Sequence, residues 1–150
     1  MSNKSIEMLG RAGETIIVNY CTAAGQKVTM SVDQYDSTKD MIIDGLKVEV
    51  KTQVPFIYKN AFSFKENQLK KCLSVDRVIF VSVPNDKMPH FSSGKVYLIK
   101  AAELKHTSYT TKDGRKMILV PIDQPGMEEL FDLSESDQKL LKGYSVSAWN

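Results

Sequence analysis

The chain has few cysteines and histidines, and this shortage excludes several kinds of site. Cys21 and Cys72 are too few and too far apart for a disulfide framework or a zinc site. They indicate two reduced, buried thiols in a cytoplasmic protein. His90 and His106 have no metal-ligand spacing with each other or with the cysteines. Both histidines are therefore interpreted as ordinary loop residues.

Long apolar runs, repeats and a strong charge bias are also missing. No stretch has the length and apolarity of a signal peptide or a membrane span, so we expect no membrane partner. There is no Gly-rich phosphate loop and no nucleophile elbow. The formal net charge is only +2, so any binding of nucleic acid has to come from a local basic patch. The 150 residues, 42% of them hydrophobic, suit one globular domain with a real core.

The most informative segment is residues 39–51, Lys-Asp-Met-Ile-Ile-Asp-Gly-Leu-Lys-Val-Glu-Val-Lys. Asp44-Gly45 separates two runs that alternate between apolar and polar residues, which predicts a two-residue hairpin turn. Asp40 then faces Glu49, with Cβ atoms roughly 4.5–5.5 Å apart. Lys51 shares the face of Glu49 because side chains alternate along a strand. The other predicted pairs are Ile43 with Leu46, Ile42 with Lys47 and Met41 with Val48.

This arrangement favours a particular chemistry. Two carboxylates at such a distance resist joint ionisation unless a cation lies between them. Mg²⁺ prefers oxygen ligands, binds one or two protein carboxylates, and keeps its other positions for water and phosphate oxygens. A lysine beside the metal can orient an attacking water or stabilise charge on a phosphate. The alternative is a solvated polar face, on which Lys47 and Lys51 neutralise the two acids.

The hairpin resembles the core of the PD-(D/E)xK nuclease superfamily, in which an Asp precedes an Asp/Glu-x-Lys triplet on the next strand. Here these are Asp40 and Glu49-Val50-Lys51, with Lys39 in place of the Pro. Asp36 is a rival for the Asp position, although it would need a longer connection between the strands.

The triplet alone is not specific, because two similar ones occur elsewhere in the chain. Glu103-Leu104-Lys105 and Asp137-Gln138-Lys139 both lack an Asp placed upstream across a short turn. The upstream Asp and the β-rich surroundings therefore distinguish the first triplet.

The resemblance covers residues 6–104 and looks closest to the small Holliday-junction-resolvase type. Gly10-Arg11-Ala12-Gly13-Glu14 matches a Gly-x-x-x-Glu position in which the Glu completes the metal site, and Gln68 matches a Gln near the active site. Read from the residues alone, Glu14 fits a solvated surface equally well, and an exposed position is the alternative for Gln68. The resemblance implies that Lys51 activates the water and that Glu14 and Gln68 form the outer shell. It implies Mg²⁺, or Mn²⁺ in its place, on Asp40, Glu49, Glu14 and the Val50 carbonyl.

The predicted fold is α/β (α+β), with a restriction-endonuclease-like core in which helices flank a central mixed sheet. The order is αβββαβ, followed by an extra C-terminal β-hairpin and helices. We expect one nuclease domain over residues 1–150, in which residues 105–150 serve recognition or oligomerisation. The predicted helices are 6–25, 64–73 (capped by Ser63), 127–131 and 134–141 (capped by Ser134), and the predicted strands are 27–32, 39–43, 46–52, 75–83, 95–100, 107–111 and 115–122.

Two basic groups are candidates for DNA contacts. Lys65, Lys70 and Lys71 lie on the second predicted helix, where a solvated helix face explains them equally well. Lys112, Arg115 and Lys116 surround the turn of a second hairpin at Asp113-Gly114. A β-ribbon can enter a major groove, although polar hairpin tips are also routine on other proteins.

The sequence therefore predicts a metal-dependent endonuclease acting on duplex DNA, site-specific in the manner of homing or restriction enzymes. Superfamily membership implies 5′-phosphate and 3′-hydroxyl ends. One site cuts one strand, so we expect a homodimer or a higher symmetric oligomer in the cytoplasm of a prokaryote, encoded by the cell or a phage. The alternatives are a Holliday-junction resolvase or another structure-specific repair nuclease on branched DNA, an RNA-directed nuclease, and a non-catalytic nucleic-acid-binding module of the same fold.

Overall fold

The computed structural model describes residues 3–30, 41–85 and 91–149. Its helices are α1 (Asn3–Ala23), α2 (Glu66–Leu73) and α3 (Glu135–Trp149), and two 3-10 turns are η1 (Ile57–Lys59) and η2 (Ala101–Glu103). The strands are β1 (Val28–Met30), β2 (Met41–Ile43), β3 (Leu46–Gln53), β4 (Ala61–Lys65), β5 (Arg77–Ser82), β6 (Lys95–Lys100), β7 (Thr107–Thr110), β8 (Lys116–Pro121) and β9 (Glu128–Asp132). They form a six-stranded sheet in the order β1-β2-β3-β5-β6-β9 and a three-stranded sheet in the order β4-β8-β7.

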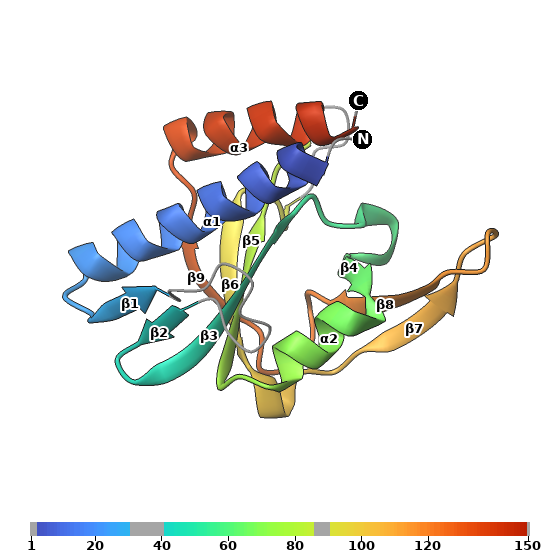
Figure 1. Cartoon of the computed structure of the whole chain (residues 1–150), viewed down its shortest axis with the longest axis horizontal. Helices are drawn as coiled ribbons and strands as arrows, with labels where there is room; N and C mark the ends of the chain where they lie inside the picture. Colours follow the sequence, from blue (N-terminus) through green and yellow to red (C-terminus); the bar gives the residue numbers. More distant parts are fainter. Residues whose placement is uncertain (1–2, 31–40, 86–90, 150) are drawn as a thin grey trace.

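The larger sheet is mixed, as predicted. Strands β1, β2 and β3 form an antiparallel meander, and β3 then runs parallel to β5. The connection between these two parallel strands contains β4 and α2. Strands β6 and β9 extend the sheet in antiparallel orientation. The molecule is therefore an α+β protein with a mixed central sheet flanked by helices (Figure 1).

The first hairpin has the predicted register. Met41 lies opposite Val48, and the two pairs nearer the turn also match the prediction. Asp44 and Gly45 have φ values of 50° and 84°, as a type I′ turn requires. The Asp44 carboxylate also accepts a hydrogen bond from the Lys27 backbone amide at 2.9 Å, which ties the turn to the start of β1. The turn chemistry thus determines which residues of β3 face each side of the sheet.

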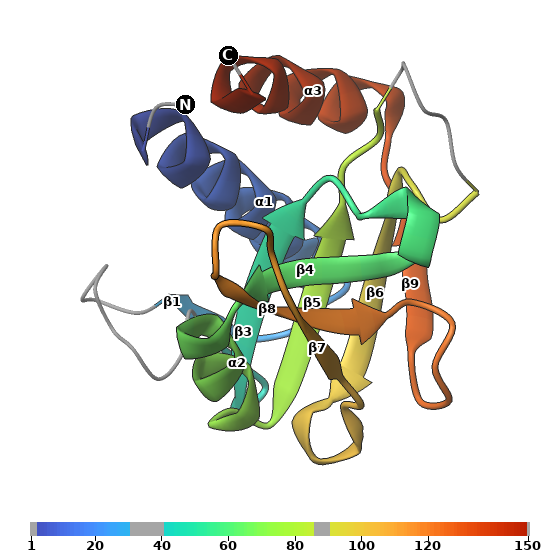
Figure 2. The same cartoon turned by 90° about the vertical axis from the view of Figure 1, so that its right-hand side faces the viewer.

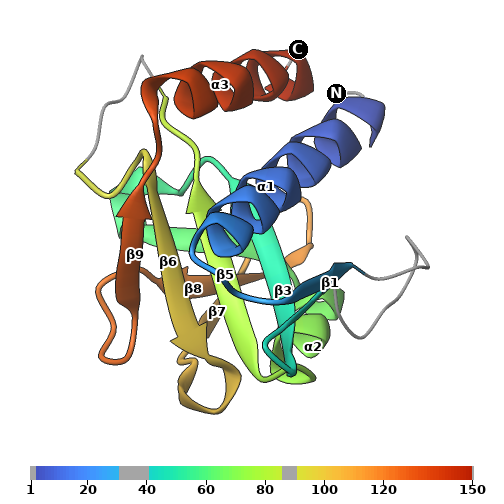
Figure 3. The same cartoon turned by 90° about the vertical axis from the view of Figure 1, so that its left-hand side faces the viewer.

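Each face of the central sheet carries its own hydrophobic core. Helices α1 and α3 cover one face, where Ile17, Val48 and Val50 pack together (Figure 3). The small sheet and α2 cover the other face, and β4 and β8 run across the strands of the central sheet (Figure 2). Phe62 and Phe80 stack there with ring centroids 4.4 Å apart. Because side chains alternate along β3, Glu49, Lys51 and Gln53 point to the side of α2, whereas Thr52 faces Gly13 of α1.

Several local predictions are confirmed. Helix α1 ends before Gly25, whose φ of 83° suits a left-handed C-terminal position. Strand β5 is the buried central strand, and β6 has the predicted bounds. Strands β7 and β8 form the second hairpin. The Ser134 hydroxyl accepts a hydrogen bond from the Asp137 amide at 3.1 Å, so Ser134 caps α3 as predicted.

Two predicted helical segments are wrong in whole or in part. Ser63 does not cap a helix, because it lies in β4 opposite Leu119 of β8, and α2 begins only at Glu66. Phe62 and Phe64 alternate along β4 and are both buried in the core on the side of α2, as the two-residue period of a strand allows. Residues 127–131 do not form a helix: β9 pairs with β6 and satisfies its backbone groups in the sheet.

The last third of the chain contributes to both cores. Ile118 and Val120 of β8 lie in the core beneath α2, whereas Leu133 and Leu141 lie in the core beneath α1. Cys21 and Cys72 are both buried, as predicted, and neither forms a disulfide. Within the described residues, no helix is long and apolar enough to cross a membrane.

Candidate functional site

Helix α2 lies beside β3 (Figure 2). The two elements bring four polar side chains together. Glu49 and Lys51 come from alternate positions of β3 and share one face. Gln68 and Lys71 are three residues apart on α2, so they lie on one side of that helix. The neighbouring side of α2 carries the buried Leu69 and Cys72, which pack into the core and fix the rotation of the helix.

Glu49 is the central residue of this cluster, because both lysines contact its carboxylate. Its side chain is 0% exposed. Its Oε2 atom lies 3.7 Å from Lys51 Nζ and 3.5 Å from Lys71 Nζ. The two lysine side chains are 13% and 23% exposed, so both are largely buried together with the carboxylate. A buried carboxylate is costly unless it is paired with opposite charge, and the two lysines provide that charge.

Lys51 is held from a second direction. Its ammonium donates a hydrogen bond to Oε1 of Gln68. Gln53, the next residue on this face of β3, accepts a hydrogen bond from the Ser63 amide at 2.7 Å and so ties β4 to β3. The face of β3 that carries Glu49 is therefore fastened to both α2 and β4. Sequence reasoning missed the role of Gln53, which no motif marks.

The remaining predicted site residues lie elsewhere. Asp40 and its rival Asp36 are outside the described residues, so the pairing of Asp40 with Glu49 stays a prediction. Glu14 is half-buried on α1, which packs on the opposite face of the sheet, and its role is likewise a prediction. The Val50 side chain belongs to the core beneath α1, and only its carbonyl was predicted as a ligand.

The donor chemistry is compatible with Mg²⁺. The described parts of the chain hold no group of three His, Cys, Asp or Glu side chains placed to bind a metal. Glu49 nevertheless offers the hard oxygen ligand that Mg²⁺ prefers, and one or two carboxylates suffice for this ion when a phosphate completes the coordination. Glu49 therefore fits the predicted cofactor in ligand type.

The predicted DNA-contacting residues have different environments. Lys65, Lys70 and Lys112 are exposed. Lys71 instead lies 3.5 Å from the Glu49 carboxylate. Lys116 lies 3.3 Å from Glu66 on α2.

Arg115 pairs with Asp113 at 3.0 Å beside the hairpin turn. A hydrogen bond from Thr111, together with this arginine, lowers the pKa of Asp113 below its usual value. The tip of the second hairpin is thus a small ordered polar network.

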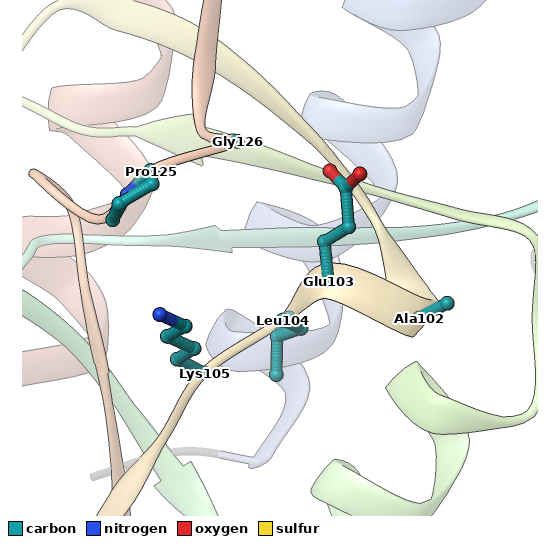
Figure 4. Close-up of a pocket in the computed structure, with 6 residues that line it drawn as sticks. All are labelled: Ala102, Glu103, Leu104, Lys105, Pro125 and Gly126. Carbon is teal, nitrogen blue, oxygen red and sulfur yellow. The ribbon is translucent and has the colours of Figure 1, made fainter.

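The second Glu-x-Lys triplet has a different setting. Glu103 ends η2, and both Glu103 and Lys105 are exposed. They line an open pocket with Pro125 and Gly126, and the two charged groups point in different directions (Figure 4). Burial and lysine pairing of the carboxylate thus distinguish Glu49 from Glu103.

No protein-family model, curated protein or solved structure matches this chain, so no family is assigned.

Proposed function

We propose that this chain is a Mg²⁺-dependent endonuclease that hydrolyses phosphodiester bonds in DNA. The observation that carries the proposal is the buried Glu49 carboxylate, which contacts Lys51 on the same face of β3. Lys51 is held in turn by Gln68 of α2. The αβββ order, followed by a crossover through α2 to β5, supports a restriction-endonuclease-like core, with β4 as an addition.

The proposed reaction is hydrolysis. Glu49, with Asp40 as its predicted partner, would hold Mg²⁺, which when bound supplies Lewis-acid activation of the phosphate and the attacking water. Lys51 orients the water and offsets the negative charge that develops on the phosphate. Gln68 keeps the Lys51 ammonium in position. The water oxygen forms a bond to phosphorus and loses a proton to solvent, while the bond between phosphorus and the 3′-oxygen breaks. The 3′-oxygen takes up a proton from solvent, and the ends are a 5′-phosphate and a 3′-hydroxyl.

The second hairpin supports duplex DNA as the substrate. All four residues of β7, Thr107–Thr110, are exposed, and the hairpin tip extends away from the body of the molecule (Figure 1). Hydroxyl and basic side chains on a two-stranded ribbon are suited to a major groove. A site-specific enzyme needs such a base-reading element, and a homodimer would place one site on each strand.

The test is cleavage of supercoiled plasmid and of a synthetic four-way junction, with Mg²⁺ and with EDTA. The proposal predicts discrete products that need Mg²⁺ and disappear in the Lys51→Met protein. Cleavage of the junction alone would favour the resolvase alternative. Binding of DNA without cleavage of any substrate would contradict the proposed endonuclease activity. It would favour a non-catalytic nucleic-acid-binding module.

A further inference from the structure

The tip of the second hairpin holds an arginine in a ring of hydrogen bonds. Gly114 has a φ of 86°, and its amide donates to the Thr111 carbonyl at 3.0 Å, which closes the turn. The Thr111 hydroxyl accepts a hydrogen bond from the Arg115 amide at 3.0 Å and donates one to the Asp113 carboxylate. That carboxylate accepts a hydrogen bond from Arg115 Nε at 3.2 Å. The Arg115 side chain is thus tied to the backbone of the turn.

The ring uses only the inner part of the arginine. Within the described residues, the hydrogen bonds of Arg115 are made by its backbone amide and its Nε, and neither Nη atom makes one. The side chain is 62% exposed and lies at a hairpin tip that extends away from the body of the molecule (Figure 1). The two Nη atoms are therefore the open end of a planar fork whose base is already held.

A fork of this kind fits one base edge in particular. Guanine presents two acceptors, N7 and O6, side by side in the major groove, and arginine pairs with both of them. Adenine presents one acceptor and one donor there, and thymine presents one acceptor beside a methyl group, so neither satisfies two donors. Holding Nε in advance also lowers the entropic cost of binding, because less of the side chain has to be ordered.

We infer that Arg115 binds a guanine in the major groove of the substrate, and that Asp113 is a positioning residue that orients the guanidinium. This inference rests on the proposed DNA substrate and gives it a base preference. The negative charge of Asp113 opposes that of the phosphates and so weakens binding to DNA in general. On a duplex without this guanine, the Arg115 guanidinium contacts a phosphate instead.

The test is selection of bound duplexes from a random-sequence DNA library in EDTA, followed by Kd measurements by fluorescence anisotropy. Wild type should enrich a guanine at one position. Replacing that G·C pair by A·T should weaken wild-type binding by about fivefold or more. Arg115→Lys keeps the charge but lacks the rigid fork. It should bind the A·T duplex like wild type and distinguish the two duplexes by about twofold or less.

Asp113→Ala separates positioning from charge and from stability. It should bind the A·T duplex at least as tightly as wild type, because a negative charge is removed, and still lose the preference for guanine. A merely structural role of Asp113 would weaken binding of both duplexes by the same factor.

Lys112→Ala is the matched control at the neighbouring position. It should weaken binding of both duplexes equally and keep the preference for guanine, as expected of a phosphate contact. Circular dichroism checks that each variant is folded.

The outcomes separate this inference from the proposed function. A guanine preference that persists in folded Arg115→Lys or Asp113→Ala would overturn the inference alone, as would a wild type that cuts DNA without any base preference. A guanine preference in a wild type that cuts no DNA would overturn the proposed nuclease activity and support the inference. Absence of both DNA binding and cleavage would overturn the two together.

Discussion

At the residue scale, the buried Glu49 carboxylate makes its lysine partners important for stability as well as chemistry. Lys51→Met should lower the free energy of unfolding by about 1–3 kcal/mol, because the buried Glu49 carboxylate loses one of its two lysine counter-charges. Lys70→Met removes an exposed lysine and should change the free energy of unfolding by no more than about 0.5 kcal/mol. Urea denaturation measures both values, and equal losses would contradict the role assigned to Lys51.

Tyr97 lies in the core on the side of α2 and predicts how the stability of the protein depends on pH. Its hydroxyl donates a hydrogen bond to the Ser92 carbonyl at 2.9 Å, and burial raises its pKa from 10.0 to about 12. The folded protein then holds this proton more tightly than the unfolded chain. The resulting stabilisation is complete below pH 10 and is lost as the pH rises towards 12.

Urea midpoints between pH 9 and 12 should therefore fall less steeply in Tyr97→Phe than in wild type. Tyr109→Phe serves as the control, since Tyr109 is an exposed tyrosine on β7. Identical slopes for Tyr97→Phe and wild type would contradict the prediction.

The sequence predicted part of the site at this scale. The shared face of Glu49 and Lys51 follows from strand alternation and a local turn, so it was predictable. The contact of Lys71 with Glu49 was not, because it depends on the rotation of α2 against β3. That rotation is set by Leu69 and Cys72, whose partners are far apart in the sequence.

At the element scale, the approach of α1 to β3 depends on one glycine. A Cβ atom built on Gly13 would lie 1.8 Å from Oγ1 of Thr52, whereas one on Gly10 would meet no atom within 4 Å. Gly13→Ala should therefore destabilise the protein by about 1–3 kcal/mol through overpacking. Gly10→Ala should stabilise it by about 0.5–1 kcal/mol, because alanine is the better helix former. Thermal denaturation separates these opposite signs, and equal shifts would contradict the packing of Gly13 on Thr52.

The errors of prediction at this scale share one cause. The Asp44-Gly45 hairpin is determined by adjacent residues, and its register was predicted in full for the pairs that the structure describes. Strands β4 and β9 are determined by distant partners, β8 and β6. Ser63 resembled a helix cap because the local pattern contains no information about β8.

At the scale of the whole molecule, the candidate site lies on one face of the central sheet and α3 lies on the other. The β7–β8 hairpin belongs to the small sheet on the side of the site. Lys112→Ala combined with Arg115→Ala should weaken duplex binding several-fold. It should also reduce the slope of log K against log salt by about two, one for each phosphate contact. Lys139→Ala on α3 should leave the duplex affinity and the salt slope unchanged. Equal effects of Lys139→Ala and of the hairpin double variant would exclude the hairpin as the DNA-contacting surface.

The central claim is that burial and lysine pairing make Glu49, and not Glu103, the catalytic carboxylate. The most direct measurement is the rate of Mg²⁺-dependent DNA cleavage by Glu49→Gln and Glu103→Gln, each checked for folding by circular dichroism. We expect Glu49→Gln to lose cleavage by at least about a hundredfold, as for other groups that stabilise a transition state, and Glu103→Gln to cut at the wild-type rate. Wild-type cleavage by folded Glu49→Gln would contradict the account.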